Sequence, residues 1–234
     1  EPARGQLEGR VDDEEAPGLS EVVRYMAGQR TFRHLCLASA FYAFAAYGFT
    51  IWGATFLIRV HGMTLTETGV AMGLIQGLGG GLGTYLGGRL ADRFAKRDER
   101  ALVGVPAVGG LLALPLLALF LFLPDRSGAL AAYALAMVFS VFFVGPSYAV
   151  AQGLARLRMR AQAAAWLMFA INLIGLGIAP LAVGVLNDAL ADRLGDEAIR
   201  YSLMITGAVS LWAVVHSFWA ARSIREDLAA ARVA

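Results

Sequence analysis

The sequence predicts an all-α membrane protein with six transmembrane helices, and three observations support this prediction. First, 58% of the 234 residues are hydrophobic and 16% are charged, with a mean hydropathy of +0.59, which is too apolar for a soluble globule of this length. Second, six long stretches contain no Asp, Glu, Lys or Arg. Third, basic residues gather in alternate connections between these stretches.

The six apolar stretches define the expected spans. Each is at least as long as the roughly 18 to 20 residues that a helix needs to cross about 30 Å of hydrocarbon. Transmembrane strands would be shorter and would alternate polar with apolar residues, a pattern that these stretches lack. The expected spans are residues 35–58, 68–88, 101–123, 127–155, 161–187 and 201–221.

Local signals mark several ends of these helices. Thr64-Leu65-Thr66-Glu67 has the pattern of a capping box and should begin the second helix. Ser223-Ile224-Arg225-Glu226 repeats the pattern and predicts that a short tail helix begins there. Pro124-Asp125-Arg126-Ser127-Gly128 is dense in turn formers and predicts a tight hairpin.

The chain outside the spans predicts a linker and a tail. Residues 1–33 are expected to be a cytoplasmic linker, 34–222 the six-helix bundle, and 223–234 a cytoplasmic tail. Residues 1–18 are acidic and rich in Pro and Gly, which is typical of disorder. The next segment repeats its apolar residues at helical spacing and predicts an amphipathic helix along the lipid boundary, or a helix that extends the first span into water. Its apolar residues are Leu19, Val22, Val23, Met26 and Ala27.

The basic residues predict which side each end occupies. Sixteen of the 20 Lys and Arg residues fall on the side shared by the termini and the even-numbered connections. By the positive-inside rule this side is cytoplasmic, so we expect a multi-pass protein with both termini in the cytoplasm. Lys96 is the single lysine in a chain rich in Ala and Gly, which favours a bacterial gene and hence the bacterial inner membrane. The first 30 residues lack the pattern of a signal peptide, and the chain is expected to be an excerpt of a longer one.

Glycine recurs every four residues in the second span, at Gly69, Gly73, Gly77 and Gly81, and Gly80, Gly83, Gly87 and Gly88 continue nearby. This spacing places the four on one face, where a neighbouring backbone is expected to pack closely, in moving helices or in a static groove. A dinucleotide-binding loop does not fit, because no G-x-G-x-x-G pattern occurs between residues 69 and 88. In the fourth span, Gly145-Pro146 predicts a bend beside a water-filled path, or one that serves packing alone.

The connection between the second and third spans concentrates charge. Its first acid, Asp92, is followed by Arg93, Lys96 and Arg97 and is preceded by Gly88. A lone carboxylate at this depth is costly unless it is paired or lies at a helix N-terminus. These residues therefore predict a charged latch that separates when two bundles move apart.

The segment Gly88-Arg89-Leu90-Ala91-Asp92-Arg93-Phe94-Ala95-Lys96-Arg97 resembles the signature loop of the major facilitator superfamily, G-x-L-x-D-R-x-G-R/K-R. One position departs, because Ala95 stands where the pattern has glycine, so this turn is not expected to adopt a left-handed conformation. By the resemblance, the cytoplasmic gate comprises Gly88, Asp92, Arg93, Lys96, Arg97 and Arg160.

Three longer stretches resemble the Spinster-like branch of that superfamily, in its carboxy-terminal six-helix half. The resemblance covers about residues 30 to 222 and implies the C-terminal bundle of a major-facilitator fold, a 3+3 inverted repeat. It also implies alternating access, with either the missing N-terminal six-helix half or a second copy of this chain as partner. The stretches are FLIRVHGMTLTETGVAMGLIQGLGGGLGTYLGGRLADR (56–93), GPSYAVAQGLARLRMRAQAAA (145–165) and INLIGLGIAPLAVGVLNDAL (171–190).

By the same resemblance, the first and fourth helices line a central cavity. Arg59 is a candidate for attracting an anionic head group, or an arginine that reaches the membrane interface. Gln76 and Asn172 are amides within the spans, for which hydrogen bonds between helices are expected. The candidate substrate-binding residues are Tyr42, Tyr47, Thr50, Trp52, Arg59, Ser147, Tyr148 and Gln152.

These features favour a secondary active transporter half that moves a small organic or lipid-like amphiphile; Spinster relatives imply lysolipid-type or sphingolipid-type substrates. The alternatives are a non-transporting membrane scaffold or receptor and, less favoured, a membrane-embedded lipid-processing enzyme. His34, His61 and His216 lie far apart in sequence and Cys36 is the single cysteine, so we expect no catalytic centre, metal site or cofactor. The small net charge gives no sign of nucleic-acid binding.

Overall fold

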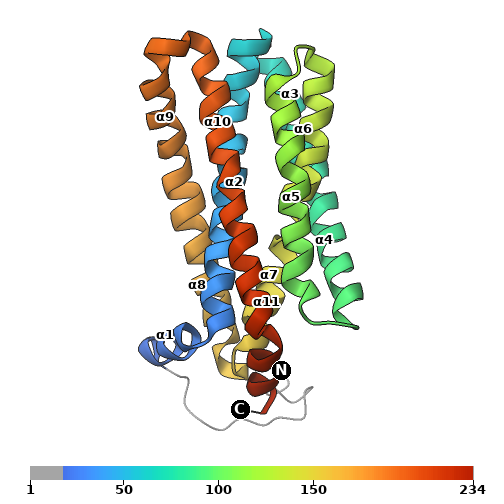
Figure 1. Cartoon of the computed structure of the whole chain (residues 1–234), viewed down its shortest axis with the longest axis vertical. Helices are drawn as coiled ribbons and strands as arrows, with labels where there is room; N and C mark the ends of the chain where they lie inside the picture. The colour runs from blue at the N-terminus through green and yellow to red at the C-terminus, as the bar shows by residue number, and fades with distance from the viewer. Residues whose placement is uncertain (1–17, 234) are drawn as a thin grey trace.

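The computed structural model describes residues 18–233, and this part of the chain folds into an upright bundle of helices (Figure 1). Of the segment predicted to be disordered, residues 1–18, all but Gly18 lies outside the described residues. Within residues 18–233, six long helical segments run up and down the bundle. They are α2 (Arg30–His61); α3 (Leu65–Leu74), η2 (Ile75–Gly79) and α4 (Gly80–Ala95); α5 (Ala101–Phe122); α6 (Arg126–Ser140) and α7 (Val144–Leu154); α8 (Arg160–Ala170), η4 (Ile171–Ile178) and α9 (Ala179–Leu194); and α10 (Ala198–Ala208) and α11 (Ser210–Val233).

The described helices agree with a membrane-spanning bundle. Four helical stretches of residues 18–233 are long and apolar enough to cross a bilayer: Arg30–His61, Ala101–Phe122, Arg126–Leu154 and Leu157–Arg232. The last contains two of the six segments, because the chain reverses at Gly195, whose φ is +53°. The segment formed by α3, η2 and α4 is more polar, since glycine, threonine and glutamine dilute its apolar residues.

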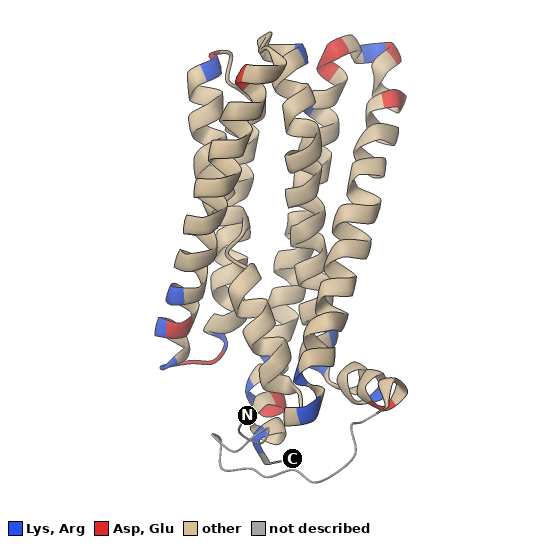
Figure 2. Ribbon diagram, turned by 180° about the vertical axis from the view of Figure 1, so that it is seen from behind, with Lys and Arg blue, Asp and Glu red and all other residues tan. Residues whose placement is uncertain are grey.

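Charged residues gather at the two ends of the bundle and are absent from most of its length (Figure 2). We call the end near α1 (Leu19–Gly28) and the C-terminus the proximal end and the opposite end the distal end. Large apolar side chains are exposed along the sides between them, such as Leu78 at 72% and Leu181 at 68%. Exposed apolar side chains of this number match hydrocarbon, so the protein is an integral membrane protein.

The distal turns follow the predicted signals. Gly62 ends α2 with a φ of +63°, and the predicted capping box begins α3. The Thr64 hydroxyl accepts a hydrogen bond from the backbone N–H of Glu67 at 3.2 Å, and the Glu67 carboxylate accepts one from the N–H of Thr64 at 2.8 Å. Asp125 caps α6 through the N–H of Gly128 at 2.6 Å, in the predicted hairpin. Each cap satisfies an amide that a helix start leaves unpaired.

The prediction of a separate helix at residue 223 is wrong, because α11 runs without a break from Ser210 to Val233. Ser223 lies within this helix, and its hydroxyl is 2.8 Å from that of Thr31. The backbone N–H of Thr31 donates to the Asp227 carboxylate at 2.9 Å. An acid from the end of the chain therefore caps the start of α2, which a local pattern could not indicate.

The amphipathic segment forms α1, which Gln29 separates from α2 with an extended ψ of 126°. The alternative, a helix that simply extends the first span, is therefore wrong. Val22 and Met26 are buried against the bundle, while Leu19 and Val23 remain exposed. One part of the apolar face of α1 therefore packs against the bundle, and the other part is exposed.

The four glycines of the predicted face meet no close neighbour within residues 18–233. Gly69, Gly73, Gly77 and Gly81 have no neighbouring atom within 4 Å of where a Cβ would stand. The close approach is made elsewhere on the same segment: a Cβ on Gly83 would lie 2.1 Å from the Val138 carbonyl oxygen, and one on Gly87 would lie 2.6 Å from the Phe142 Cα. A period of four identifies a face of a helix but not what lies opposite.

The predicted bend in the fourth span is present between α6 and α7. The helix is interrupted at residues 141–143 and resumes at Val144, just before Gly145-Pro146. Proline has no N–H to donate to the preceding turn, so a break there costs few hydrogen bonds. The bend packs against α4 in ordinary van der Waals contact, since a Cβ on Gly145 would be 3.7 Å from the Gly88 Cα.

Candidate functional site

A cavity of about 470 Å³ lies among α2, η2, the bend between α6 and α7, and η4. Its polar lining comprises two phenols, a hydroxyl and two amides, and the other lining residues are apolar or aromatic. No residue that lines it carries a charge. A mostly apolar concave surface with a few polar groups is typical of a small-molecule site. The polar lining residues are Tyr47, Thr50, Gln76, Tyr148 and Asn172.

Two π-helical stretches bring the amides to this cavity. Gln76 lies in η2 and Asn172 in η4, each within a segment otherwise composed of α-helix. The wide π turn displaces side chains from the regular α-helical pattern and occurs frequently at functional sites. The Asn172 side-chain N–H donates to the Met168 carbonyl at 2.8 Å. Because Met168 belongs to the same segment, this hydrogen bond is not the one between helices that the sequence predicts.

Three of these polar groups are free to meet a ligand. The Tyr47 and Tyr148 hydroxyls and the Gln76 amide make no hydrogen bond to another residue within positions 18–233. Phenols and amides both donate and accept hydrogen bonds, so the cavity offers both functions without a fixed charge. This arrangement suits a ligand with a large apolar part and an uncharged or internally balanced polar part.

Of the eight predicted binding residues, Tyr47, Thr50 and Tyr148 line the cavity, and three others join helices to one another. The Tyr42 hydroxyl is buried 3.2 Å from that of Ser217. The Ser39 hydroxyl donates to the Ser147 hydroxyl at 2.9 Å. The Trp52 indole N–H donates to the Pro180 carbonyl at 3.0 Å.

The two remaining predicted residues lie elsewhere on the surface. Gln152 is exposed near the proximal end of α7, and Arg59 is exposed near the distal end of α2. Neither lines the cavity. A second gap beside Tyr42, Phe49 and Tyr133 holds about 20 Å³, roughly the space of one water molecule, and is too small for a substrate.

The predicted gate residues lie at the proximal end. Asp92, Arg93, Lys96 and Arg97 are exposed at the end of α4, and Gly88 is half-buried beside the α6–α7 bend. Asp92 forms no ion pair with any described residue. Arg160 is half-buried at the start of α8, so it belongs to the same end but to a different segment.

Two other acids of this connection are paired, which the sequence did not indicate. The Asp98 carboxylate accepts a hydrogen bond from the backbone N–H of Arg100 and lies 2.8 Å from the Arg225 guanidinium. These two contacts lower the pKa of Asp98 below its usual range. Glu99 pairs with Arg232. Both arginines come from α11, more than 120 residues along the chain, so no local pattern could match them.

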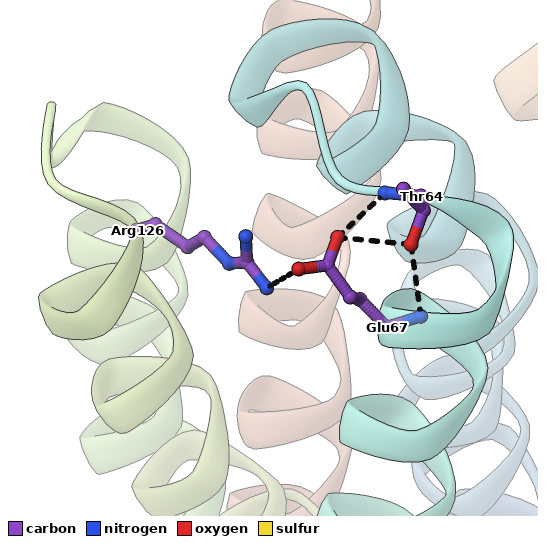
Figure 3. A network of polar contacts seen from close by, with 3 residues as sticks. All are labelled: Thr64, Glu67 and Arg126. Carbon is purple, nitrogen blue, oxygen red and sulfur yellow. Dashed lines mark hydrogen bonds and ion pairs between the residues drawn. The ribbon is translucent and has the colours of Figure 1, made fainter.

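At the distal end the capping box of α3 extends into a clasp, which we define as Thr64, Glu67 and Arg126 (Figure 3). The second carboxylate oxygen of Glu67 lies 2.9 Å from the Arg126 guanidinium, at the start of α6. The backbone hydrogen bond from Thr64, followed by the side-chain hydrogen bond from Arg126, lowers the pKa of Glu67 to about 2. The clasp joins the second helical segment to the fourth at the distal end of the bundle.

We expect Glu67→Gln to lower the unfolding temperature of the protein in detergent at neutral pH. Glutamine keeps the capping box but removes the ion pair with Arg126. The low pKa of Glu67 means that its contribution is complete above about 4.5 and is lost as the pH falls toward about 2. The difference from the unmodified protein should therefore shrink in that window, whereas Asp192→Asn, at an exposed distal acid, should show no such trend. A difference in unfolding temperature that stays the same at every pH would contradict the ion pair of the clasp.

Comparisons with known proteins agree with this architecture. The sequence profile of the Major Facilitator Superfamily matches residues 2–180. An MFS-type efflux pump of Mycolicibacterium smegmatis (strain ATCC 700084 / mc(2)155) is 33% identical over 219 residues, which are 93% of this chain and 50% of the pump.

Two solved structures have a similar fold, and both are of a bacterial homologue of the human lysosomal transporter Spinster. The inward-facing, unoccupied form superposes with a TM-score of 0.82 at 25% identity and covers 93% of this chain and 53% of that one. The inward-facing, occupied form has a TM-score of 0.75 at 25% identity, covering 92% and 54%. The chain thus spans about half the length of these relatives, and it belongs to the Major Facilitator Superfamily, with the fold of a Spinster-like half.

Proposed function

We propose that this chain is the carboxy-terminal half of a secondary active transporter that moves a small organic or lipid-like amphiphile by alternating access. The observation that carries the proposal is the uncharged cavity of about 470 Å³ with free phenols at Tyr47 and Tyr148. The relatives that support it are an efflux pump and a Spinster homologue. An amphiphile fits this cavity because its apolar part matches the walls and its polar part can bond to the phenols.

The second half of the transport path comes from a partner, either an N-terminal six-helix half or a second copy of this chain. The partner is expected to cover the open face that carries Gly69, Gly73, Gly77 and Gly81, which has no neighbour within residues 18–233. Two six-helix halves that rock about a shared site provide alternating access. The partner face also includes Asp92, whose carboxylate would there find the partner that it lacks among the described residues.

A flux assay in proteoliposomes distinguishes the three functional classes. A fluorescent single-chain amphiphile is supplied outside vesicles that contain the chain, alone or with a six-helix partner half. A transporter moves the intact probe across the bilayer faster than empty vesicles do. A scaffold or receptor gives the rate of empty vesicles, and a lipid-processing enzyme converts the probe chemically; either result would contradict the proposal.

We propose that the proximal end faces the cytoplasm of a bacterium, across its inner membrane. The excess of basic residues at that end supports this orientation. Lys96 provides a direct measurement, because it is the single lysine and is exposed. A membrane-impermeant amine reagent should modify Lys96 in inside-out vesicles and leave it unmodified in intact spheroplasts, as read by peptide mapping. The opposite pattern would reverse the orientation.

Asp92→Asn is expected to shift the balance between inward-facing and outward-facing states without unfolding the protein. The carboxylate is exposed and makes no intramolecular ion pair with a described residue, so its loss removes a contact to the partner half rather than one that holds this bundle. The shift is measured by labelling a cysteine at Tyr148 from each side, in a Cys36→Ala background. Asp196→Asn, an exposed distal acid, serves as the control, and equal labelling in both variants would count against the latch.

A further inference from the structure

We propose that the groove between the start of α2 and the end of α11 binds the phosphate headgroup of an anionic phospholipid. The groove holds about 530 Å³ and lies at the proximal end, where charged residues gather (Figure 2). This binding does not depend on the transport function proposed above. The groove is lined by Arg30, His34, Trp219, Arg222, Ser223 and Glu226.

The headgroup groove is separate from the central cavity. The two sets of lining residues have no member in common. Both use α2, but His34 and Tyr47 are thirteen positions apart, which places them about 140° from each other around a helix of 3.6 residues per turn. A ligand of the groove therefore touches a different side of α2 from a ligand of the cavity.

Two guanidinium groups in the groove lack a counter-ion among the described residues. Among residues 18–233, no carboxylate lies within 4.0 Å of Arg30 or Arg222, although Glu226 lines the same groove. Arg222 instead rests over the Phe218 ring at 4.7 Å. Guanidinium groups bind phosphate oxygens through paired hydrogen bonds, so two unpaired arginines beside one hollow favour a phosphate-bearing ligand.

The inner side of the groove is fixed by an aromatic cluster. The Nδ1 atoms of His34 and His216 are 3.0 Å apart, so one ring donates a hydrogen bond to the other. The ring centroid of Trp219 lies 5.4 Å from that of His34 and 5.1 Å from that of His216. The sequence separates these histidines by 182 residues, and the fold joins them. The cluster holds the imidazole of His34 in place on the groove wall, beside the arginines.

The surroundings of the groove favour a lipid over free phosphate. Leu37, Phe218 and Trp219 are exposed large apolar side chains of the same two helices, at 38%, 59% and 37%. Acyl chains attached to a headgroup can lie along these side chains, whereas inorganic phosphate cannot use them. Basic pockets between helices at a membrane surface bind lipid headgroups in this manner.

Native mass spectrometry of the purified chain in detergent tests the inference, with phosphatidylglycerol and phosphatidylcholine as probes. We expect phosphatidylglycerol to be retained more tightly, and Arg30→Gln with Arg222→Gln to weaken its retention by roughly thirtyfold, since each arginine near a membrane surface contributes about fivefold. Arg89→Gln, at an exposed proximal arginine outside the groove, should leave retention unchanged. Gel filtration of each variant checks that it stays folded.

A variant with the opposite sign separates binding from misfolding. Glu226→Gln removes the acid from the groove and should strengthen phosphatidylglycerol retention by roughly fivefold, by the same electrostatic reasoning. Equal retention of the two lipids, or an unchanged affinity in the double arginine variant, would overturn the inference. Displacement of the lipid by inorganic phosphate at equal concentration would also overturn it, because the site would then recognise the free anion.

Discussion

Gly83→Ala should destabilise the protein by about 3 kcal/mol or more, the largest effect expected from adding one methyl group to this chain. A Cβ at this position would lie 2.1 Å from the Val138 carbonyl oxygen and 2.6 Å from the Val141 side chain. The Val138 carbonyl is part of the backbone, so it cannot rotate out of the way as a flexible side chain can. Segment α4 would therefore have to move away from the α6–α7 bend, opening the contact that shapes one wall of the cavity.

The matched control is Gly81→Ala, two residues earlier on the same segment. No atom lies within 4 Å of a Cβ built there, and alanine is the better helix former by about 1 kcal/mol. The two identical changes should therefore have opposite signs in thermal unfolding of the detergent-solubilised chain. A Gly83→Ala variant that melts at or above the temperature of the unmodified protein would show that the close approach of α4 and α6 is absent.

Tyr47→Phe combined with Tyr148→Phe should lower transport of the amphiphile by about tenfold or more while leaving the unfolding temperature nearly unchanged. Each change removes one hydroxyl that makes no hydrogen bond to a described residue, so folding loses little. A ligand that bonded to both would lose roughly 0.5 to 1.5 kcal/mol at each position. The rate is measured in the proteoliposome flux assay with the partner half present.

Tyr201→Phe provides the control for the cavity variants. Tyr201 is exposed at the distal end and touches Phe122 by its ring, so its hydroxyl lies outside the cavity. Replacing Tyr47 and Tyr148 together by alanine should reduce transport further, by about a hundredfold, because ring contacts are lost as well. Transport that is unaffected by either pair of changes would place the substrate path elsewhere.

The segments of the fold could be predicted because the bilayer imposes a length and a composition on each. The apolar run 101–123 matches α5 to within one residue, and the Thr64 capping box begins α3 as predicted. The predicted helix ends were wrong where the contact that decides them is distant in sequence. Ser223 has the pattern of a helix start, yet Thr31 and Asp227 join α2 to α11 there and the helix continues.

The candidate site was predictable only in part, for a related reason. The resemblance to the superfamily indicates which helices line the cavity, but the face of each helix depends on packing. Tyr42 and Tyr47 are five positions apart on α2, and one bonds to Ser217 while the other lines the cavity. The π turns that bring Gln76 and Asn172 inward have no local sequence pattern beyond the nearby glycines.

Pairings between distant charges and rings were the features that the sequence concealed most completely. Glu67 and Arg126 are 59 residues apart, and His34 and His216 are 182 apart. Each residue has an ordinary local role, as a capping acid, a turn arginine or an interfacial histidine. Only the antiparallel stacking of the segments gives them a second partner.

Accessibility of a cysteine at Tyr148, in a Cys36→Ala background, tests the account most directly. The cavity beside Tyr148 should open to one side of the membrane at a time, so a membrane-impermeant thiol reagent should label the cysteine from either side, with a ratio that changes when amphiphile is added. Labelling from one side alone, at a ratio that amphiphile never changes, would contradict alternating access through this cavity.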